Sequence, residues 1–185
     1  MKNNSDINKK LENLALNYLS KFETSEKQFK DFLKKKVLKL NIELENSKQD
    51  NLIENILTKM KELNYVNDYR YSDLKSEKIF NIGGSKRMII AKLKEKGISK
   101  KIIDISLEKL LKNNKDELVS ALIYLKKRRI GIFFYKKLSE NERTEFKKKW
   151  HGTLARRGFS YEITKQALSI EDQFQAENII NRMKI

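Results

Sequence analysis

The sequence has no cysteine and no proline, and it has only one histidine, one tryptophan and six glycines among 185 residues. Without cysteine the chain can form neither a disulfide nor a thiolate metal site. The lone His151 also excludes a metal site built from several histidines and cysteines. Missing proline and scarce glycine argue against an all-β chain, which needs many turns. Composition therefore predicts an all-α protein, and we expect no cofactor.

Long apolar runs are missing as well. No stretch approaches the roughly 20 apolar residues that a membrane-spanning helix needs. The first residues, Met1–Asp6, are polar and lead into an amphipathic segment, which does not resemble the apolar core of a signal peptide. We expect a soluble, cytoplasmic protein without membrane contact, acting as a monomer.

Positive charge is plentiful. The 41 lysines and arginines exceed the 25 acidic residues, which gives a formal net charge of +16. Such an excess favours a polyanionic partner, either nucleic acid or a nucleoprotein. Lysine, asparagine and isoleucine are all common while arginine is scarce, so an A/T-rich genome also contributes to the lysine count.

Two segments, Leu93–Leu107 and Leu154–Leu168, share one pattern. In each, an apolar residue and basic residues end a helix, and a glycine (Gly97 or Gly158) closes it in the left-handed conformation. A serine two residues later then caps the next helix. Self-similarity of this kind is typical of helical-repeat proteins.

The repeated pattern predicts an elongated, curved array of three tandem three-helix modules. We place the modules at residues 1–66, 67–113 and 114–185, with a helical tail ending the third. The first module is the most divergent, because Val37 stands where the glycine is expected and a polar insertion at 41–50 delays its third helix.

Capping residues mark the expected helix starts. Asp6 is a candidate cap for the first helix, and Ser85 for the helix that follows the Gly83–Gly84 turn. Capping boxes are predicted for Ser25 with Gln28, Asn114 with Glu117, and Ser139 with Glu142. The apolar segment Ile130–Tyr135 is expected to tuck into the third module. Residues Glu171–Met183 are expected to form a short helical tail with Phe174, Ile179 and Ile180.

Catalytic patterns are weak. Gly83-Gly84-Ser85-Lys86 superficially resembles a phosphate-binding loop, but it lacks the earlier glycine and the preceding strand of that motif. His151 is interpreted as a packing residue. The scattered carboxylates form no spaced pair for acid–base catalysis. We therefore expect a protein that is not an enzyme.

The candidate binding residues are basic and recur beside the glycine turns, so stacked modules would align them into a basic stripe. They are Lys34, Lys35, Lys36, Arg87, Lys96, Lys100, Lys101, Lys126, Lys127, Arg128, Arg129, Arg156 and Arg157. The alternative is that they only complement the helix dipole, which favours cations near a helix C-terminus. Tyr124, Tyr135 and Tyr161 are either stacking partners for bases or supports for the core.

Four segments in order, Asn67–Tyr71, Gly84–Ile89, Leu93–Ile98 and Arg156–Ser160, resemble the RecX family of bacterial proteins that act on RecA recombinase filaments. The resemblance extends over roughly Leu11–Leu168. It implies a non-enzymatic regulator, in DNA repair, recombination and the SOS response. Such a regulator binds in the groove of the RecA–DNA filament and restrains ATPase, strand-exchange and coprotease activities. For such a regulator we predict weak, salt-sensitive binding to bare single-stranded DNA and much tighter association with assembled RecA filaments.

A second hypothesis is an autonomous nucleic-acid-binding protein, since helix–turn–helix readers also place a short turn between helices. The helix after Gly158 would then read bases with Tyr161, Lys165 and Gln166. Glu162 on the same helix would face phosphates poorly, which disfavours sequence-specific reading.

Overall fold

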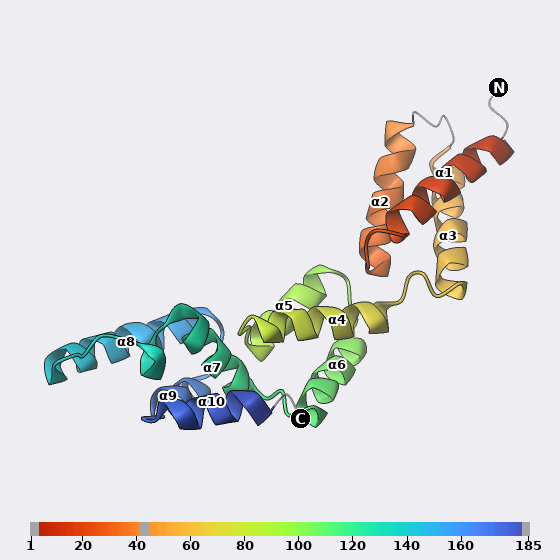
Figure 1. Cartoon of the computed structure of the whole chain (residues 1–185). Coiled ribbons are helices and arrows are strands. Elements are labelled where there is room, and N and C mark those ends of the chain that lie inside the picture. Colours follow the sequence, from red (N-terminus) through yellow and green to blue (C-terminus); the bar gives the residue numbers. More distant parts are fainter. Residues whose placement is uncertain (1–3, 41–44, 183–185) are drawn as a thin grey trace. The chain divides into compact units, whose positions relative to one another are not determined.

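A computed structural model describes residues 4–40 and 45–182 of the protein (Figure 1). Within these ranges the chain is helical and contains no strand, which confirms the predicted all-α class. The elements are α1 (Asn4–Leu19), α2 (Glu26–Lys39), α3 (Asn46–Glu62), α4 (Asp68–Asn81), α5 (Lys86–Glu95), α6 (Lys100–Lys112), α7 (Glu117–Arg128), the 3-10 turn η1 (Gly131–Phe133), α8 (Glu140–Arg156), α9 (Tyr161–Leu168) and α10 (Gln173–Asn181).

The chain divides into two compact units. The first comprises residues 1–71 together with the turn at 95–99, and the second comprises residues 72–94 and 100–185. The predicted division into three modules, ending at residues 66, 113 and 185, stays a prediction.

The first unit buries the facing sides of α1, α2 and α3. Phe29 and Leu33 of α2, one helical turn apart, are fully buried between Leu11 of α1 and Met60 of α3. Burying each large apolar side chain contributes about 1.5–3 kcal/mol, so this contact layer dominates the stability of the helix trio. The ring of Tyr18 stacks on Phe32 at a centroid distance of 4.0 Å and extends the core to its edge.

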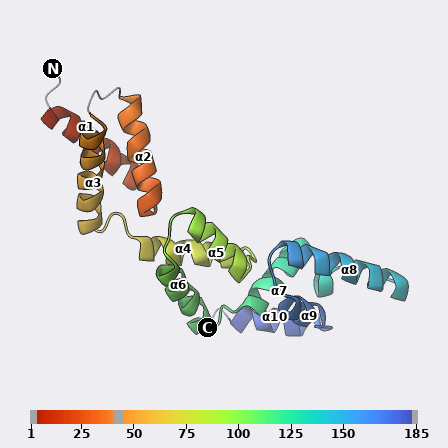
Figure 2. The same ribbon diagram turned by 180° about the vertical axis from the view of Figure 1, so that it is seen from behind.

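The second unit has its own core, built where α7, α8, α9 and α10 meet. Leu122 and Leu125 of α7 are fully buried with Leu154 of α8. Both views show α9 and α10 lying against α7 (Figure 1, Figure 2). Partly buried Ile130, Ile132 and Phe133 pack on this core, so this part of the apolar segment tucks inward as expected. Tyr135 at the end of the segment does not, because it is 76% exposed.

The tail helix α10 also covers this core, through Ala176 and Ile180. Phe174, which was named with Ile179 and Ile180 as an apolar residue of this tail, is 72% exposed. Asp172 accepts hydrogen bonds from the backbone N–H groups of Phe174 and Gln175 at 3.1 and 3.0 Å. Because Asp172 caps the helix there, Phe174 falls in the first turn, away from the buried stripe.

Polar contacts join α4 to α6. The Ser106 hydroxyl lies 2.8 Å from Ser72 Oγ and 2.6 Å from Asp73 Oδ1. Lys109 of α6 pairs with Asp73, and Lys115, in the connection after α6, pairs with Glu77. This face of α4 is therefore held by hydrogen bonds and ion pairs in addition to apolar packing.

Helix α3 begins earlier than predicted, at Asn46, inside the segment expected to be an insertion. The N–H groups of Lys48 and Gln49 bond to the carbonyl of Glu45, so these polar residues already form the first turn. Lysine and glutamine are good helix formers, and an exposed polar turn costs a helix little. Residues 41–44 of the predicted insertion lie outside the described residues.

The capping predictions have mixed outcomes. Ser139 and Glu142 form the predicted capping box. Asn114 does not cap α7; it takes a left-handed conformation (φ 55°), and Asp116 accepts from Val119 N at 2.9 Å instead. The first helix starts at Asn4, so Asp6 lies within its first turn.

Candidate nucleoprotein-binding surface

In the first unit, the glycine turn at 95–99 packs on the N-terminus of α2. The buried Ser25 Oγ accepts a hydrogen bond from Gln28 N at 3.3 Å and donates one to the Lys96 carbonyl at 2.7 Å. The next backbone N–H, that of Glu26, donates to Asp68 Oδ1 at 2.9 Å. The helix cap thus serves two segments that are distant in sequence.

The second unit repeats this arrangement with different residues. Ser85 Oγ accepts from Met88 N at 3.2 Å and donates to the Arg157 carbonyl at 2.8 Å. The N–H of Lys86 donates to Glu117 Oε1 at 3.1 Å. Asp68 opens α4, two helices after α2, and Glu117 opens α7, two helices after α5. The two carboxylates therefore play the same part.

We call this arrangement the serine–turn joint. It consists of an N-cap serine, a glycine turn whose carbonyl accepts the serine hydroxyl, and a carboxylate that accepts the following N–H. Gly97 and Gly158 both have positive φ, 81° and 91°. A Cβ on Gly158 would lie 2.8 Å from Ser85 Oγ, so the turn approaches the serine too closely for any larger residue.

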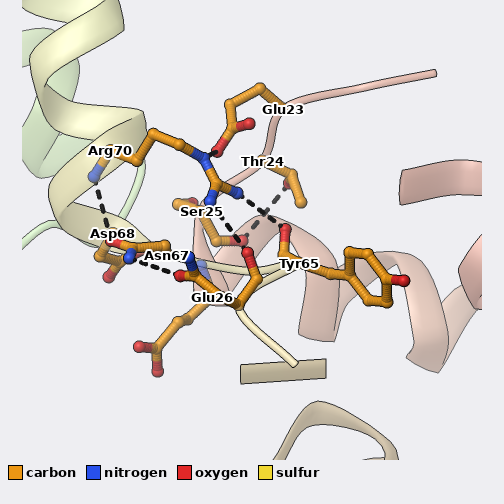
Figure 3. A network of polar contacts seen from close by, with 9 residues as sticks. Glu23, Thr24, Ser25, Glu26, Tyr65, Asn67, Asp68 and Arg70 are labelled. Carbon is orange, nitrogen blue, oxygen red and sulfur yellow. Dashed lines mark hydrogen bonds and ion pairs between the residues drawn. The ribbon is translucent and has the colours of Figure 1, made fainter. Parts of the chain in front are cut away.

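A network around Arg70 surrounds the first joint (Figure 3). Its guanidinium donates to Glu23 Oε1 at 3.0 Å and to the carbonyls of Asn64 and Tyr65 at 2.9 and 3.1 Å. Asn67 Oδ1 accepts a hydrogen bond from Arg70 N at 3.0 Å and so caps α4. Arg70 thus donates hydrogen bonds to carbonyls that follow the end of α3, and this holds the start of α4 against that end.

Burial raises the pKa of Asp68 above its ordinary value, although the hydrogen bond from Glu26 N opposes this shift. A raised carboxyl pKa means that the folded protein holds the neutral form more tightly than the unfolded chain does. Asp68 therefore accepts the hydrogen bond from Glu26 N at a position where burial disfavours its charged form.

Two predicted binding residues belong to the joints. Arg157 donates through Nε to the Gly83 carbonyl at 3.3 Å, and its guanidinium lies 4.8 Å from the centroid of the Tyr124 ring. The carbonyl of Lys96 accepts the hydrogen bond from Ser25 Oγ, and the ammonium of Lys96 lies 3.9 Å from Glu95 Oε1. Tyr124 packs, partly buried, against the core of the second unit, which is one of the two roles considered for it, and its ring also contacts Arg157.

Three other predicted cations are engaged locally. Lys100 pairs with Asp104 at 2.8 Å, and Lys126 pairs with Glu177 at 3.0 Å. The ammonium of Lys36 lies 5.3 Å from the Phe32 ring centroid. These contacts are exposed, and each contributes little to stability.

The remaining predicted cations are exposed: Lys34, Lys35, Arg87, Lys101, Lys127, Arg128, Arg129 and Arg156. Three of them are consecutive, and we call Lys127–Arg129 the α7 end cluster. The alignment of all these residues into one basic stripe stays a prediction.

Other functional groups are sparse. In the described ranges, no group of three or more histidine, cysteine, aspartate or glutamate side chains is placed to hold a metal ion. Among the helices described, none is long and apolar enough to cross a membrane. Ser85, after the Gly83–Gly84 turn, caps α5 as its sequence suggested, and its hydroxyl also belongs to a joint.

The fold and these contacts define a class of protein: a basic, all-helical chain in which capped helices are joined through repeated glycine turns. No protein-family model matches the chain. It is 34% identical over 154 residues to the regulatory protein RecX of Finegoldia magna, covering 83% of this chain and 67% of that protein. It is 28% identical over 166 residues to the regulatory protein RecX of Myxococcus xanthus, covering 85% and 83%.

Solved structures agree with the fold. The crystal structure of RecX from Lactobacillus salivarius superposes with a TM-score of 0.61 at 24% identity, covering 91% of this chain and 98% of that one. A second crystal structure of regulatory protein RecX gives 0.60 at 18% identity, covering 89% and 74%. The chain belongs to the RecX family, and its relatives' names support a regulatory role.

Proposed function

We propose that the protein regulates RecA recombinase by binding in the groove of the RecA–DNA filament and restraining its ATPase, strand-exchange and coprotease activities. Membership in the RecX family carries the proposal. The net charge of +16 supports it, because a DNA-containing filament is a long polyanion. The protein acts as a monomer of three modules, and it binds bare single-stranded DNA only weakly.

The α7 end cluster is the part of the predicted surface best suited to such contacts. Lys127 and Arg128 follow each other at the exposed end of α7, and Arg129 continues them in a left-handed conformation (φ 54°). A cation that neutralises a phosphate releases counterions, so binding should weaken steeply with salt. Regulation follows if the protein binds one filament state better than another.

The test is the ATPase rate of the cognate RecA on single-stranded DNA, with the protein titrated in. Wild type should lower the rate in a saturable way. Reversing two charges of the cluster, Lys127→Glu with Arg128→Glu, should raise the concentration for half-inhibition about tenfold or more, because two anionic contacts become repulsive.

The matched control is Lys9→Glu with Lys10→Glu on α1, where both side chains are exposed and lie outside the predicted surface. It changes the net charge equally and should inhibit almost like wild type. Equal affinity for single-stranded DNA with and without RecA would favour the autonomous nucleic-acid-binding hypothesis instead.

A further inference from the structure

A shallow groove of about 470 Å³ lies between α8 and α9. It is lined by residues of α8 and α9 and of the turn between them: Lys148, His151, Gly152, Ala155, Phe159, Tyr161 and Thr164. Its volume falls in the range of small-molecule sites. No carboxylate lines it. The groove therefore sets no negative charge of its own against an anionic ligand.

Tyr161 gives the groove an aromatic surface. Its side chain is 68% exposed, and its ring stacks on the ring of His151 at a centroid distance of 6.0 Å and an angle of 25°. The imidazole supports the phenol ring from one side and holds its orientation. An exposed ring held in this way is preorganised for stacking by a second flat group.

The larger aromatic cluster nearby is less available. Phe134, Phe146 and Trp150 contact one another at centroid distances of 5.1–5.7 Å. Each ring is also partly buried. These side chains pack with each other, so Tyr161 is the better candidate for stacking on a ligand.

Two cations lie at the groove. Lys148 lines it directly. A Cβ added to Gly152 would lie 3.4 Å from Nη1 of Arg156, which places this guanidinium beside the groove wall. Neither cation pairs with a carboxylate in the part of the chain described here. Glu162 lines a separate hollow with Lys165 and Gln166, to one side of Tyr161.

We propose that this groove binds one nucleotide of a single-stranded nucleic acid. The base stacks on Tyr161, and the adjoining phosphates are neutralised by Lys148 and Arg156. A duplex does not fit this chemistry, because its base faces are already stacked. The buried Thr164 hydroxyl, which has no hydrogen-bond partner among the described residues, is a further polar group for a base edge. The inference rests on the proposed function, since it gives the single strand of the filament a place on this protein.

The experiment measures binding of a short fluorescein-labelled oligothymidylate to the protein alone, by fluorescence anisotropy at low salt. Tyr161→Ala should weaken binding roughly 5- to 150-fold, the range for losing one base stack on an aromatic ring. Tyr161→Phe should keep most of the affinity, because it keeps the ring. Lys148→Ala should lower the slope of log K against log salt by about 0.7, the value for one phosphate contact on a single strand.

Tyr135→Ala is the matched control, since Tyr135 is 76% exposed and lies next to lysines but outside the groove. It should bind like wild type, as should Lys78→Ala on α4. Unchanged affinity of Tyr161→Ala, or equal losses for Tyr161→Ala and Tyr135→Ala, would overturn the groove.

An acidic peptide is the competing occupant. If Tyr161→Ala loses affinity for polyglutamate but keeps it for oligothymidylate, the nucleotide assignment is wrong. The RecA ATPase titration is a separate measurement: absence of inhibition by wild type contradicts the proposed function, whereas the oligothymidylate experiment uses no RecA and tests the groove by itself.

Discussion

Replacing Ser85 by alanine should test the serine–turn joint most directly. The Ser85 side chain is completely buried (0% exposed) and makes two hydrogen bonds, one as the acceptor for Met88 N and one as the donor to the Arg157 carbonyl. Alanine is nearly the same size and fits without strain. The substitution therefore removes both hydrogen bonds and little packing.

The expected cost has two parts. Losing a serine N-cap costs about 0.5–2 kcal/mol. Leaving the Arg157 carbonyl in the joint without its donor adds about 1–3 kcal/mol. We expect the free energy of unfolding of Ser85→Ala to fall by about 2–4 kcal/mol.

Ser160→Ala provides the matched comparison within the same unit. Ser160 also caps a helix, accepting from Ile163 N at 3.2 Å, but its side chain is exposed and makes no hydrogen bond to a joint carbonyl. It should cost about 1 kcal/mol. Urea unfolding followed by far-ultraviolet circular dichroism measures both variants, and the difference between them isolates the joint hydrogen bond.

The reasoning fails if Ser85→Ala is no less stable than Ser160→Ala. In that case the short contact to the Arg157 carbonyl contributes nothing net, and the serine is a simple cap. Ser25→Ala should show the same excess cost in the first unit, because Ser25 donates to the Lys96 carbonyl in the equivalent way.

Two further predictions concern the joints. Gly158→Ala should destabilise the protein by at least about 1 kcal/mol, because the φ of Gly158 is 91° and the new Cβ would meet Ser85 Oγ. Gly152→Ala in α8 should instead stabilise the protein by up to about 1 kcal/mol, because alanine is the better helix former. Thermal melts that rank the two variants the other way would contradict this. The pKa of Asp68 is higher in the folded protein than in the unfolded chain. At pH values between these two pKa values, folding is therefore accompanied by proton uptake, and the contribution of Asp68 to stability falls as the pH rises through this range. Asp68→Asn keeps an oxygen acceptor for Glu26 N, so its free energy of unfolding should equal or exceed that of wild type at neutral pH. Any such advantage should disappear in acid, where wild-type Asp68 is itself neutral. Urea unfolding across a pH series measures this, and an advantage that grows in acid would refute it.

Local features of the fold could be predicted from the sequence because their partners are close in the chain. Ser139 and Glu142 are three residues apart, and the capping box depends on nothing else. Gly97 and Gly158 take the left-handed conformation that the turn pattern requires. Asn114 and Asp116 can each either cap the start of a helix or end the preceding helix. The sequence pattern alone did not decide which residue does which.

The joints could not be predicted, because their partners are distant in sequence. Ser25 and Lys96 are 71 positions apart, and Ser85 and Arg157 are 72 apart. Sequence separation also explains why the role of Arg157 was not foreseen. Because Arg157 lies beside a glycine turn, it was predicted to bind a partner molecule. Its actual contacts, Gly83 and Tyr124, come from other parts of the second unit. The near-equal spacing of the two serine–turn pairs was the available signal.

The serine that opens α8 is used differently from the serines of the two joints. Ser25, Ser85 and Ser139 each cap the second helix of a proposed module, yet the Ser139 hydroxyl donates to its own neighbour, Glu142 Oε2, at 2.7 Å. A hydroxyl has one proton to donate, so while Ser139 bonds Glu142 it is not a donor to a distant turn. The same cap residue therefore joins distant segments in two places and serves only its own helix in the third.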